Sequence, residues 1–278
     1  MALPNLSSLS YVARLRCIQS IHEPADRRNP DTRVRQLLPL LERWRAARLG
    51  REELARLRED PFYYYLIART RYYDTVFQDA VLDRVQQVVN VGCGSDTRAY
   101  RFRQLLRSHG VTVLECDQPE LIAAKRRLVK WWRSLDHVEY LPIDLNDGAW
   151  PDLERSLRAR TGSKALVVME GVSPYVDARA FRLFLQVLST ALSPGSHVAY
   201  DFKIPGVNDG FGRVGRTERP FRLSRKEDEV KAFHADHGLR LDHLESSSGL
   251  CARLLPGVVK PPLVLFDEDG LVRLQVAR

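Results

Sequence analysis

The chain has 278 residues, of which 44% are hydrophobic and 28% are charged. This composition is typical of a globular protein and excludes a disordered, collagen-like or low-complexity chain. The 43 Lys and Arg residues exceed the 35 Asp and Glu residues and give a formal charge of +8. Taken alone, that excess suggests an anionic partner such as nucleic acid, a membrane surface or an acidic substrate.

The distribution of the charge weakens that suggestion. Thirty-six of the basic residues are Arg and seven are Lys, a bias that GC-rich coding produces without any binding role. Residues 1–71 carry 14 basic and eight acidic residues, so their charge is +6 and that of the other 207 residues is +2. The excess therefore belongs mainly to the N-terminal segment, and we expect no nucleic-acid partner.

The four cysteines show neither a CxxC motif nor metal-ligand spacing. We therefore expect free thiols, a cytoplasmic location and no metal site. Residues 1–10 lack a signal-peptide pattern, and no apolar run approaches the roughly 18 residues of a membrane helix. The sequence accordingly predicts no membrane partner.

Residues 1–80 show helical patterns and no strand pattern. The apolar residues that recur at helical spacing are Leu37, Leu38, Leu40, Leu41 and Trp44. A charged helix is predicted over 51–58 and ends at Asp60-Pro61. We interpret residues 1–80 as a helical cap or lid over a second unit, residues 81–278.

From residue 85 onward, short apolar runs alternate with amphipathic helical stretches. Strands are predicted at 87–91, 111–115, 138–142, 165–169 and 197–202. Helices are predicted between them at 96–108, 119–134, 150–160 and 178–192. This alternation indicates βαβ units and a mostly parallel sheet with helices on both faces.

The last third of the chain begins with a loop at 204–222 that contains four glycines, and we take about 204–224 as an insertion. A helix is predicted at 225–237. Strand-like stretches follow at 239–245, 262–266 and 271–276.

The most informative motif joins the first predicted strand to the first predicted helix. Val88-Val-Asn-Val runs into Gly92-Cys-Gly94, and a Ser-Asp-Thr helix start follows. Glycine at both positions lets the backbone turn tightly and approach a bound nucleotide-like ligand. In an open α/β sheet, ligands bind at the carboxyl ends of such strands.

Acidic residues end the next three predicted strands. Asp117 lies 23 residues beyond Gly94, where a carboxylate can accept hydrogen bonds from ribose hydroxyls. Asp144 follows the third strand and is placed to meet an adenine amino group, and Glu170 follows the fourth. Four successive strands that end in glycine or acid indicate a ligand site.

The residues after the Gly-x-Gly turn favour one cofactor over another. A dinucleotide site requires a third glycine, but Thr97 stands there and the neighbouring Asp96 would repel a diphosphate. S-adenosylmethionine (SAM) contains adenosine without phosphate. Its ammonium and sulfonium suit Asp96 and Glu170, and its carboxylate requires an Arg. A nicotinamide-dependent oxidoreductase is therefore the less favoured alternative.

Four segments together resemble the leucine carboxyl methyltransferase family: Arg69–Asp74, Asn90–Arg101, Glu115–Pro119 and Met169–Tyr175. The resemblance covers about residues 60–200. It implies an α/β class I methyltransferase fold, with a Rossmann-like, mostly parallel seven-stranded sheet, an N-terminal helical lid and an insertion over the active site.

The resemblance also implies residues that bind each part of SAM. They are Arg71 on the methionine carboxylate, Gly92 and Gly94 beneath it, Asp117 on the ribose, Asp144 and Leu145 at the adenine end, and Glu170 on the ammonium or nearby hydroxyls. Two departures from the family pattern are Cys93 between the glycines and Ser173-Pro174 before Tyr175.

The acceptor is less constrained than the cofactor. Methyl transfer is an in-line displacement in which a carboxylate acceptor needs no base, whereas a hydroxyl needs a base or an electropositive pocket. Arg69, Tyr73 and Tyr175 are candidate acceptor-site residues, and no catalytic base is identified. We favour O-methylation of a carboxyl or hydroxyl group on a polyketide-like small molecule of bacterial secondary metabolism. The alternative that the family implies is methylation of a protein's C-terminal leucine carboxylate.

Overall fold

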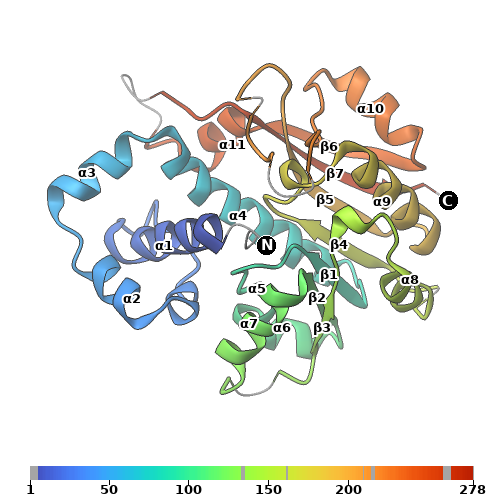
Figure 1. Ribbon diagram of the computed structural model, residues 1–278, viewed down its shortest axis with the longest axis horizontal. Helices are drawn as coiled ribbons and strands as arrows, with labels where there is room; N and C mark the ends of the chain where they lie inside the picture. Colours follow the sequence, from blue (N-terminus) through green and yellow to red (C-terminus); the bar gives the residue numbers. More distant parts are fainter. Residues whose placement is uncertain are drawn as a thin grey trace.

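The computed structural model describes residues 6–132, 135–160, 162–208, 210–213, 217–258 and 264–277, with side chains from residue 11 onward. Its centre is one sheet of seven strands, shown in Figure 1. The strands are β1 (Gln87–Val91), β2 (Thr112–Asp117), β3 (Val138–Pro142), β4 (Ala165–Met169), β5 (His197–Lys203), β6 (Leu239–Ser246) and β7 (Asp269–Val276).

The strand order is β3-β2-β1-β4-β5-β7-β6. Strands β1 to β5 pair in parallel, and β7 lies antiparallel between β5 and β6. A parallel sheet with this order and one reversed strand is the class I methyltransferase topology, so the predicted fold class is confirmed. Every residue of β1 and β4 is buried, because helices cover both faces of the central strands.

The predicted strands agree with the structure to within two residues at either end, with one exception. The prediction of a strand at 262–266 is wrong where it can be compared: residues 264–266 form no strand, and 262–263 lie outside the described residues. The apolar character of this segment comes from packing rather than from pairing, since Phe266 stacks on Tyr65 at a ring distance of 4.7 Å.

Helices cover both faces of the sheet. On one face lie α4 (Pro61–Leu82), α5 (Arg98–Arg101), α6 (Arg103–Ser108) and α11 (Ser247–Leu254). On the other face lie α8 (Pro151–Arg158), α9 (Ala178–Ala191) and α10 (Glu227–Ala235). The remaining helix of this region, α7 (Pro119–Val129), packs against β2 and β3.

Two helix predictions differ from the structure, and one helix was not predicted. The helix expected at 96–108 is two short helices, α5 and α6, and the helix expected at 119–134 ends at Val129, with 133–134 outside the described residues. Helix α11 was not predicted, because its sequence Ser-Ser-Gly-Leu begins with weak helix formers. Its start is stabilised by the hydroxyl of Ser246, which accepts a hydrogen bond from the Gly249 N–H at 3.0 Å.

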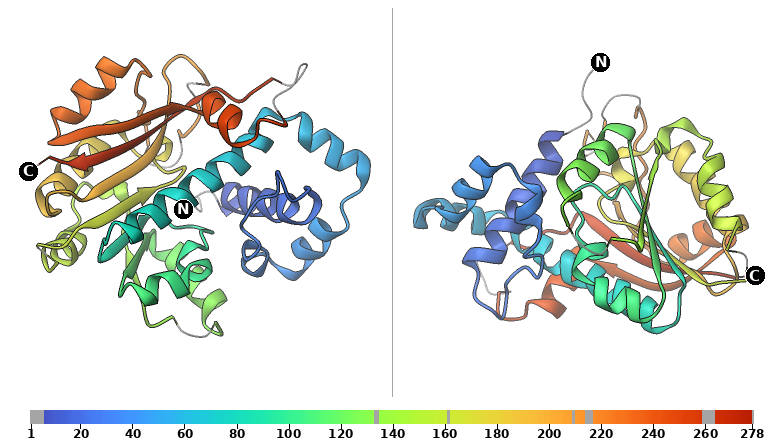
Figure 2. Two further views of the ribbon diagram at one scale, coloured as in Figure 1. Left: turned by 180° about the vertical axis from the view of Figure 1, so that it is seen from behind. Right: turned by 90° about the horizontal axis from the view of Figure 1, so that it is seen from below.

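The N-terminal region contains α1 (Leu6–His22), the 3-10 helix η1 (Val34–Leu37), α2 (Leu40–Ala47) and α3 (Arg51–Glu59). Figures 1 and 2 show these blue helices gathered at one end of the molecule, with α4 running from them onto the sheet. The described part of residues 1–80 holds helices and no strand, as predicted. The division into 1–80 and 81–278 stays a prediction, and α4 continues across it.

Strand alternation decides which side chains face α4. Val168 of β4, Ala199 of β5 and Leu271 of β7 belong to the apolar core on the α4 side of the sheet. Because side chains on one face recur every second residue, Glu170 and Asp201 point to that same side. The alternation therefore directs the acidic side chains at the strand ends toward α4.

The segment 204–224, expected as an insertion, is anchored on both sides where it is described. Lys203 pairs with Arg222, and Asp177 pairs with Pro220, in isolated bridges. Phe221 is buried against Phe181 at a ring distance of 4.2 Å.

Among the described helices, none is both long and apolar enough to cross a membrane.

Candidate active site

A cavity lies at the carboxyl ends of β1, β4 and β5, beside the point where the sheet order reverses between β1 and β4. Ligands of open α/β sheets bind at this position. Helices α1 and α4 cover the cavity. The predicted residues that line it are Arg69, Gly92, Gly94, Glu170 and Tyr175. Its other lining residues are Val12, Arg16, Phe62, Asn90, Cys93, Ser95, Asp96, Gly171, Pro174, Asp201, Lys203, Phe211 and Asp269.

The Gly-x-Gly turn follows β1 and forms one wall of the cavity. Gly92 has a φ of +66° and Gly94 a φ of +33°, so both lie in the left-handed region that favours glycine. The N–H of Gly94 donates to Asp117 Oδ2 at 2.7 Å, and the N–H of Gln118 donates to Asp117 Oδ1 at 2.8 Å. Burial raises the pKa of Asp117, and these two amides oppose the shift. The carboxylate of Asp117 therefore binds backbone N–H groups of Gly94 and Gln118 and does not line the cavity.

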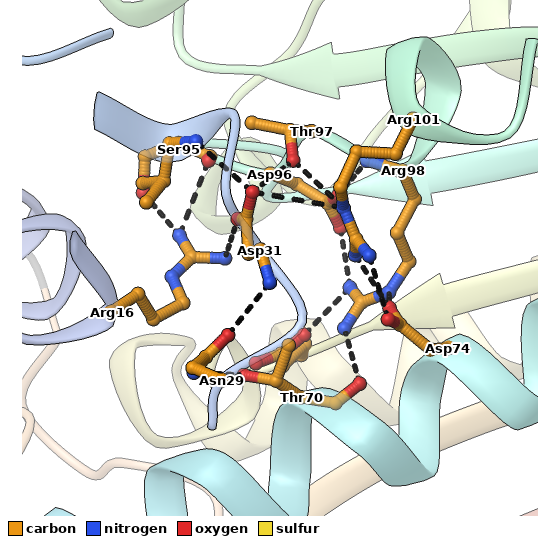
Figure 3. A network of polar contacts seen from close by, with 12 residues as sticks. Arg16, Asn29, Asp31, Thr70, Asp74, Ser95, Asp96, Thr97, Arg98 and Arg101 are labelled. Carbon is orange, nitrogen blue, oxygen red and sulfur yellow. Dashed lines mark hydrogen bonds and ion pairs between the residues drawn. The ribbon is translucent and has the colours of Figure 1, made fainter. Parts of the chain in front are cut away.

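Arg98, the first residue of α5, connects the Gly-x-Gly turn to α4, as Figure 3 shows. Its Nη1 donates to Asp96 Oδ2 at 2.6 Å and to Glu170 Oε2 at 2.7 Å, and its Nε donates to Asp74 Oδ1 at 2.8 Å. The residue is 1% exposed, so these charges compensate one another away from water. Burial favours protonation of Asp96 and Glu170, but Arg98 outweighs it and holds the pKa of both carboxyls below its usual value.

Arg69 of α4 lies between the ends of β4 and β5. Its Nε donates to Glu170 Oε1 and its Nη1 to Asp201 Oδ2, both at 3.2 Å. The Gly171 N–H and the Tyr73 hydroxyl donate to Asp201 Oδ1 at 2.6 and 3.3 Å. The structure therefore brings Arg69 and Glu170 together. Tyr73, expected at the acceptor site, lies fully buried behind Asp201 and does not line the cavity.

Arg71 lies on another side of α4, because residues two apart on an α-helix are separated by about 200° around its axis. Its guanidinium donates to the backbone carbonyls of Asp26, Arg28 and Leu254 at 2.9, 3.0 and 3.3 Å. The structure does not bring Arg71 to the cavity, contrary to the role that the resemblance implied. Arg71 instead fastens the loop after α1 and the end of α11 to α4, and Arg69 is the arginine of this motif that reaches the site.

Asp144 and Leu145 lie farther along the same edge of the sheet. Asp144 caps the 3-10 helix η2 (Leu145–Asp147), in which Leu145 is buried. The Ile143 N–H donates to the Asp117 carbonyl at 2.8 Å, so this segment directly adjoins the end of β2. Neither Asp144 nor Leu145 lines the cavity.

Arg16 fastens α1 over the Gly-x-Gly turn. Its Nη2 donates to the Ser95 carbonyl at 3.1 Å and its Nη1 to Asp31 Oδ2 at 3.2 Å. Asp31 is fully buried and also accepts hydrogen bonds from the Thr97 hydroxyl at 2.5 Å and the Val34 N–H at 3.0 Å. Figure 3 shows these contacts as one network around Asp31. The N-terminal segment is therefore attached to the loop that forms the cavity wall.

A comparison with known protein families matches residues 11–189 to the leucine carboxyl methyltransferase model. The match covers more than half of the chain. The chain belongs to the leucine carboxyl methyltransferase family. The resemblance inferred from the sequence motifs is confirmed.

Two relatives of this family member come from mycobacteria, and both are provisionally named S-adenosyl-L-methionine-dependent methyltransferases. The protein from Mycobacterium marinum is 30% identical over 183 residues, which are 64% of this chain and 60% of that protein. One from Mycobacterium ulcerans is 34% identical over 182 residues, which are 64% of this chain and 53% of that protein. The chain thus spans little more than half the length of these relatives.

Among solved structures, an O-methyltransferase family protein from Burkholderia thailandensis is similar at a TM-score of 0.46 and 17% identity. The match covers 81% of this chain and 63% of that protein. The fold of this family member is identified by its own sheet order. It is not identified by this match, because the TM-score is low.

Sequence reasoning missed five charged residues in or beside this site: Arg16, Arg98, Asp201, Lys203 and Asp269. A signal for Asp201 and Lys203 was present, because both stand at the carboxyl end of a predicted strand, as the predicted acids do. No local signal identifies Arg16, which reaches the site from a helix 79 residues before Ser95. Asp269 reaches it because β7 pairs antiparallel with β5, which places Asp269 directly opposite Lys203.

Proposed function

We propose that this chain is a SAM-dependent O-methyltransferase whose acceptor is a small molecule. The observation that carries the proposal is that one cavity joins the Gly-x-Gly turn after β1 to ionised acids and arginines at the ends of the neighbouring strands. Family membership and the names of the mycobacterial relatives support the same reaction class. Nucleic acid and membranes are not expected partners.

The charges around the cavity fit the amino-acid end of SAM, which carries both a carboxylate and an ammonium. We assign the carboxylate to Arg69 and Arg16, whose guanidinium groups face the cavity. The ammonium is assigned to Glu170 and Asp96, whose pKa values lie below their usual range. Gly92 and Gly94 would lie beneath this end of the cofactor.

The nucleoside end of SAM is assigned to the adjoining strand ends. The Gly94 N–H donates to Asp117, and we assign Asp117 to the ribose. Asp144 and Leu145 come next along the same edge of the sheet and are assigned to the adenine. These assignments keep the order that the sequence predicted, with Arg69 in place of Arg71.

Bound SAM supplies a methyl group on a positively charged sulfur, which an acceptor oxygen attacks in line. The protein's part is to hold the two reactants in that alignment and to exclude water. Arg69 and Arg98 are already fixed by ion pairs with Glu170, so little rearrangement is needed at the moment of reaction. Helix α1 contributes Val12 and Arg16 to the lining of the cavity.

Titration calorimetry with S-adenosylhomocysteine tests the proposal, and we expect binding in the micromolar range. Arg69→Lys keeps a positive charge beside Glu170 and Asp201 but loses the guanidinium geometry. This substitution should weaken binding about tenfold, which corresponds to about 1.4 kcal/mol. Arg71→Lys is the matched control on the same helix and should change affinity by less than about threefold.

Four results would overturn the proposal, its residue assignment or its acceptor class. Absence of S-adenosylhomocysteine binding would exclude a SAM-dependent enzyme. Protection against heat unfolding by NADH instead would indicate an oxidoreductase. A larger loss of affinity in Arg71→Lys than in Arg69→Lys would restore the role that the resemblance gave to Arg71. Methylation of a peptide with a C-terminal leucine, detected by mass, would favour the protein acceptor over a small molecule.

A further inference from the structure

The apolar side chains that line the cavity differ chemically from the charged side chains assigned to SAM. They include the ring of Phe62 on α4, Pro174 and Tyr175 after β4, and Phe211 of the insertion. Tyr175 and Phe211 lie against each other at a ring distance of 5.5 Å. We refer to Phe62, Pro174, Tyr175 and Phe211 as the aromatic lining of the cavity. Such a lining suits a flat, apolar ring.

The cations that line the cavity are compensated by acids in the part of the chain that the structure describes. Arg16 is paired with Asp31 at 3.2 Å, and Arg69 is paired with Glu170 and Asp201. Lys203 Nζ lies 2.8 Å from Asp269 Oδ1 and 3.1 Å from Glu268 Oε2. Four acids and three bases line the cavity: Asp96, Glu170, Asp201 and Asp269 against Arg16, Arg69 and Lys203.

This charge balance bears on the acceptor. SAM brings one carboxylate, which competes for the arginines, and an ammonium and a sulfonium, which suit Glu170 and Asp96. The side-chain cations of the described lining are already paired with acids. A second carboxylate, on the acceptor, would therefore find no uncompensated side-chain cation, and a buried charge without such a partner is unfavourable. A neutral hydroxyl carries no such penalty, but it must lose its proton to become a good nucleophile. The cavity therefore favours a hydroxyl acceptor provided that a base is present.

Asp201 has the geometry of that base. It is 2% exposed and lines the cavity. Two neutral donors, the Gly171 N–H and the Tyr73 hydroxyl, bond its Oδ1, and among the described residues only Arg69 bonds its Oδ2. Asp269 is less suitable, because the ammonium of Lys203 lies 2.8 Å from its Oδ1. Burial raises the pKa of Asp201 and nearby Asp269 raises it further, whereas Arg69 lowers it.

The titratable and charged groups around Asp201 come from three packed elements. They are Arg69, Tyr65, Tyr72 and Tyr73 on α4, Glu170 after β4, and Asp269 on β7. The tyrosines have pKa values raised by burial, so they stay neutral while Asp201 titrates. Asp201 is therefore the carboxylate of this cluster that can accept a proton close to neutral pH.

We propose that the acceptor is a phenol-type hydroxyl on a flat aromatic ring and that Asp201 receives its proton during methyl transfer. This inference rests on the proposed function. The hydroxyl O–H bond breaks and the proton passes to the Asp201 carboxylate, while a bond forms between the acceptor oxygen and the methyl carbon. The methyl carbon–sulfur bond breaks, and its electron pair stays on sulfur to give neutral S-adenosylhomocysteine. Asp201 then releases the proton to solvent.

The first experiment compares matched acceptors on one ring system. Wild-type protein is incubated with SAM and either 1-naphthol, 2-naphthol or the corresponding naphthoic acids, and methylated products are measured by mass spectrometry. We expect methyl ethers of the naphthols and no esters of the acids. Esters in place of ethers, or no transfer to either naphthol, would overturn this inference. S-adenosylhomocysteine binding is measured alongside, and its absence would identify a failure of the proposed function instead.

The second experiment tests Asp201 itself. Asp201→Asn should keep S-adenosylhomocysteine affinity within about threefold but slow transfer to 2-naphthol about 100-fold, the usual contribution of a positioned base. The loss should be much smaller for a nitronaphthol that is already ionised at the assay pH. Equal losses for both acceptors would show a structural role and overturn the assignment. Glu268→Gln, which removes the other partner of Lys203, is the matched control and should not discriminate between the acceptors.

Tyr73→Phe provides a further test that does not disturb the ion pairs of Asp201. It removes a hydroxyl that donates to the carboxylate at 3.3 Å, which makes the charged form less stable. The acidic limb of the kcat/KM profile against pH should therefore move to higher pH. An unchanged profile would exclude Asp201 as the titrating base.

Discussion

At the scale of single residues, Gly92 is a position of the candidate site where the backbone tolerates little change. Its φ is +66°, and a Cβ built on it would overlap with the Cγ2 of Val172. Gly92→Ala should therefore suffer both backbone strain and a steric clash, at a combined cost of about 3 kcal/mol. We expect a lower urea midpoint and no measurable S-adenosylhomocysteine binding.

Gly110 gives a matched control for this substitution. It has the same φ of +66°, but a Cβ there would meet nothing within 4 Å. Gly110→Ala should cost only about 1 kcal/mol of backbone strain and leave binding unchanged. Equal losses of stability and of binding in the two variants would mean that the steric clash with Val172 does not account for the effect of Gly92→Ala.

His234 is the residue whose protonation should most directly couple stability to pH. His234 lies on α10 and is fully buried. Its Nδ1 donates to the Val230 carbonyl at 2.6 Å. Because the neutral ring then carries its hydrogen on Nδ1, its Nε2 accepts from the Tyr200 hydroxyl at 2.6 Å. Burial lowers the pKa of His234 to about 4. The unfolded chain binds this proton near pH 6.5 and the folded chain only near pH 4. The free energy of unfolding therefore falls as the pH decreases from about 6.5 to about 4. The loss is about 3 kcal/mol.

Urea unfolding at pH 7, 6.5, 5.5 and 5 measures this effect. His234→Gln should show a flatter decline than the wild type, while His109→Gln, on the exposed end of α6, should follow the wild type. The difference is read between pH 6.5 and 5, above the range in which most carboxylates titrate. Parallel curves for wild type and His234→Gln would contradict the assignment.

At the scale of secondary-structure elements, Asp31 determines how α1 is attached to the site. It joins Arg16 on α1 to Thr97 beside the Gly-x-Gly turn. Asp31→Asn keeps the shape of the side chain but leaves the buried Arg16 without its counter-charge. We expect faster amide hydrogen exchange over 11–22 and about tenfold weaker S-adenosylhomocysteine binding.

The control removes a pair from the exposed side of the same helix. Glu53 lies 3.4 Å from Arg14 of α1, and 56% of its side chain is exposed. Surface ion pairs contribute little, so Glu53→Gln should leave both exchange and binding unchanged. Unaltered exchange over 11–22 in Asp31→Asn would show that apolar packing alone holds α1 in place.

Elements and residues could be predicted where the neighbouring sequence indicates them. They could not be predicted where they depend on contacts between distant segments. β1 and β4 agree with their predictions because continuous apolar runs identify strands buried on both faces. The motif around Arg69 and Arg71 indicated that an arginine reaches the site, but choosing between them required the rotation of α4. Arg16 and Asp269 reach the site through contacts between segments far apart in the chain, which no local pattern indicates.

At the scale of the whole molecule, the N-terminal helices and the sheet share one hydrophobic core. Ile18 of α1, Val34 of η1 and Tyr65 of α4 belong to the same buried cluster as Val88 of β1 and Leu166 of β4. The buried ion pair of Arg98 with Asp74 crosses the same boundary, as do the hydrogen bonds from Arg16 to the Ser95 carbonyl and from the Thr97 hydroxyl to Asp31. Although the sequence divides at about residue 80, the packing across that point indicates a single cooperative unit.

Four buried cysteines test this cooperativity without added probes. Cys17 lies in α1, Cys93 and Cys116 lie at the ends of β1 and β2, and Cys251 lies in α11. Because none is exposed, a brief pulse of iodoacetamide at each urea concentration labels only the molecules in which that region has unfolded. If the core is one unit, all four cysteines should show the same urea midpoint by peptide mass spectrometry.

Earlier labelling of Cys17 than of Cys116 would contradict a single unit and show that the N-terminal helices unfold separately. The same measurement on Asp31→Asn separates the two kinds of contact across the boundary. If the polar contacts of Asp31 with Thr97 and Arg101 carry the coupling, Cys17 should become reactive at lower urea in that variant while Cys116 keeps its midpoint. If the apolar core carries it, the four midpoints should fall together, because a destabilised cooperative unit still unfolds as one.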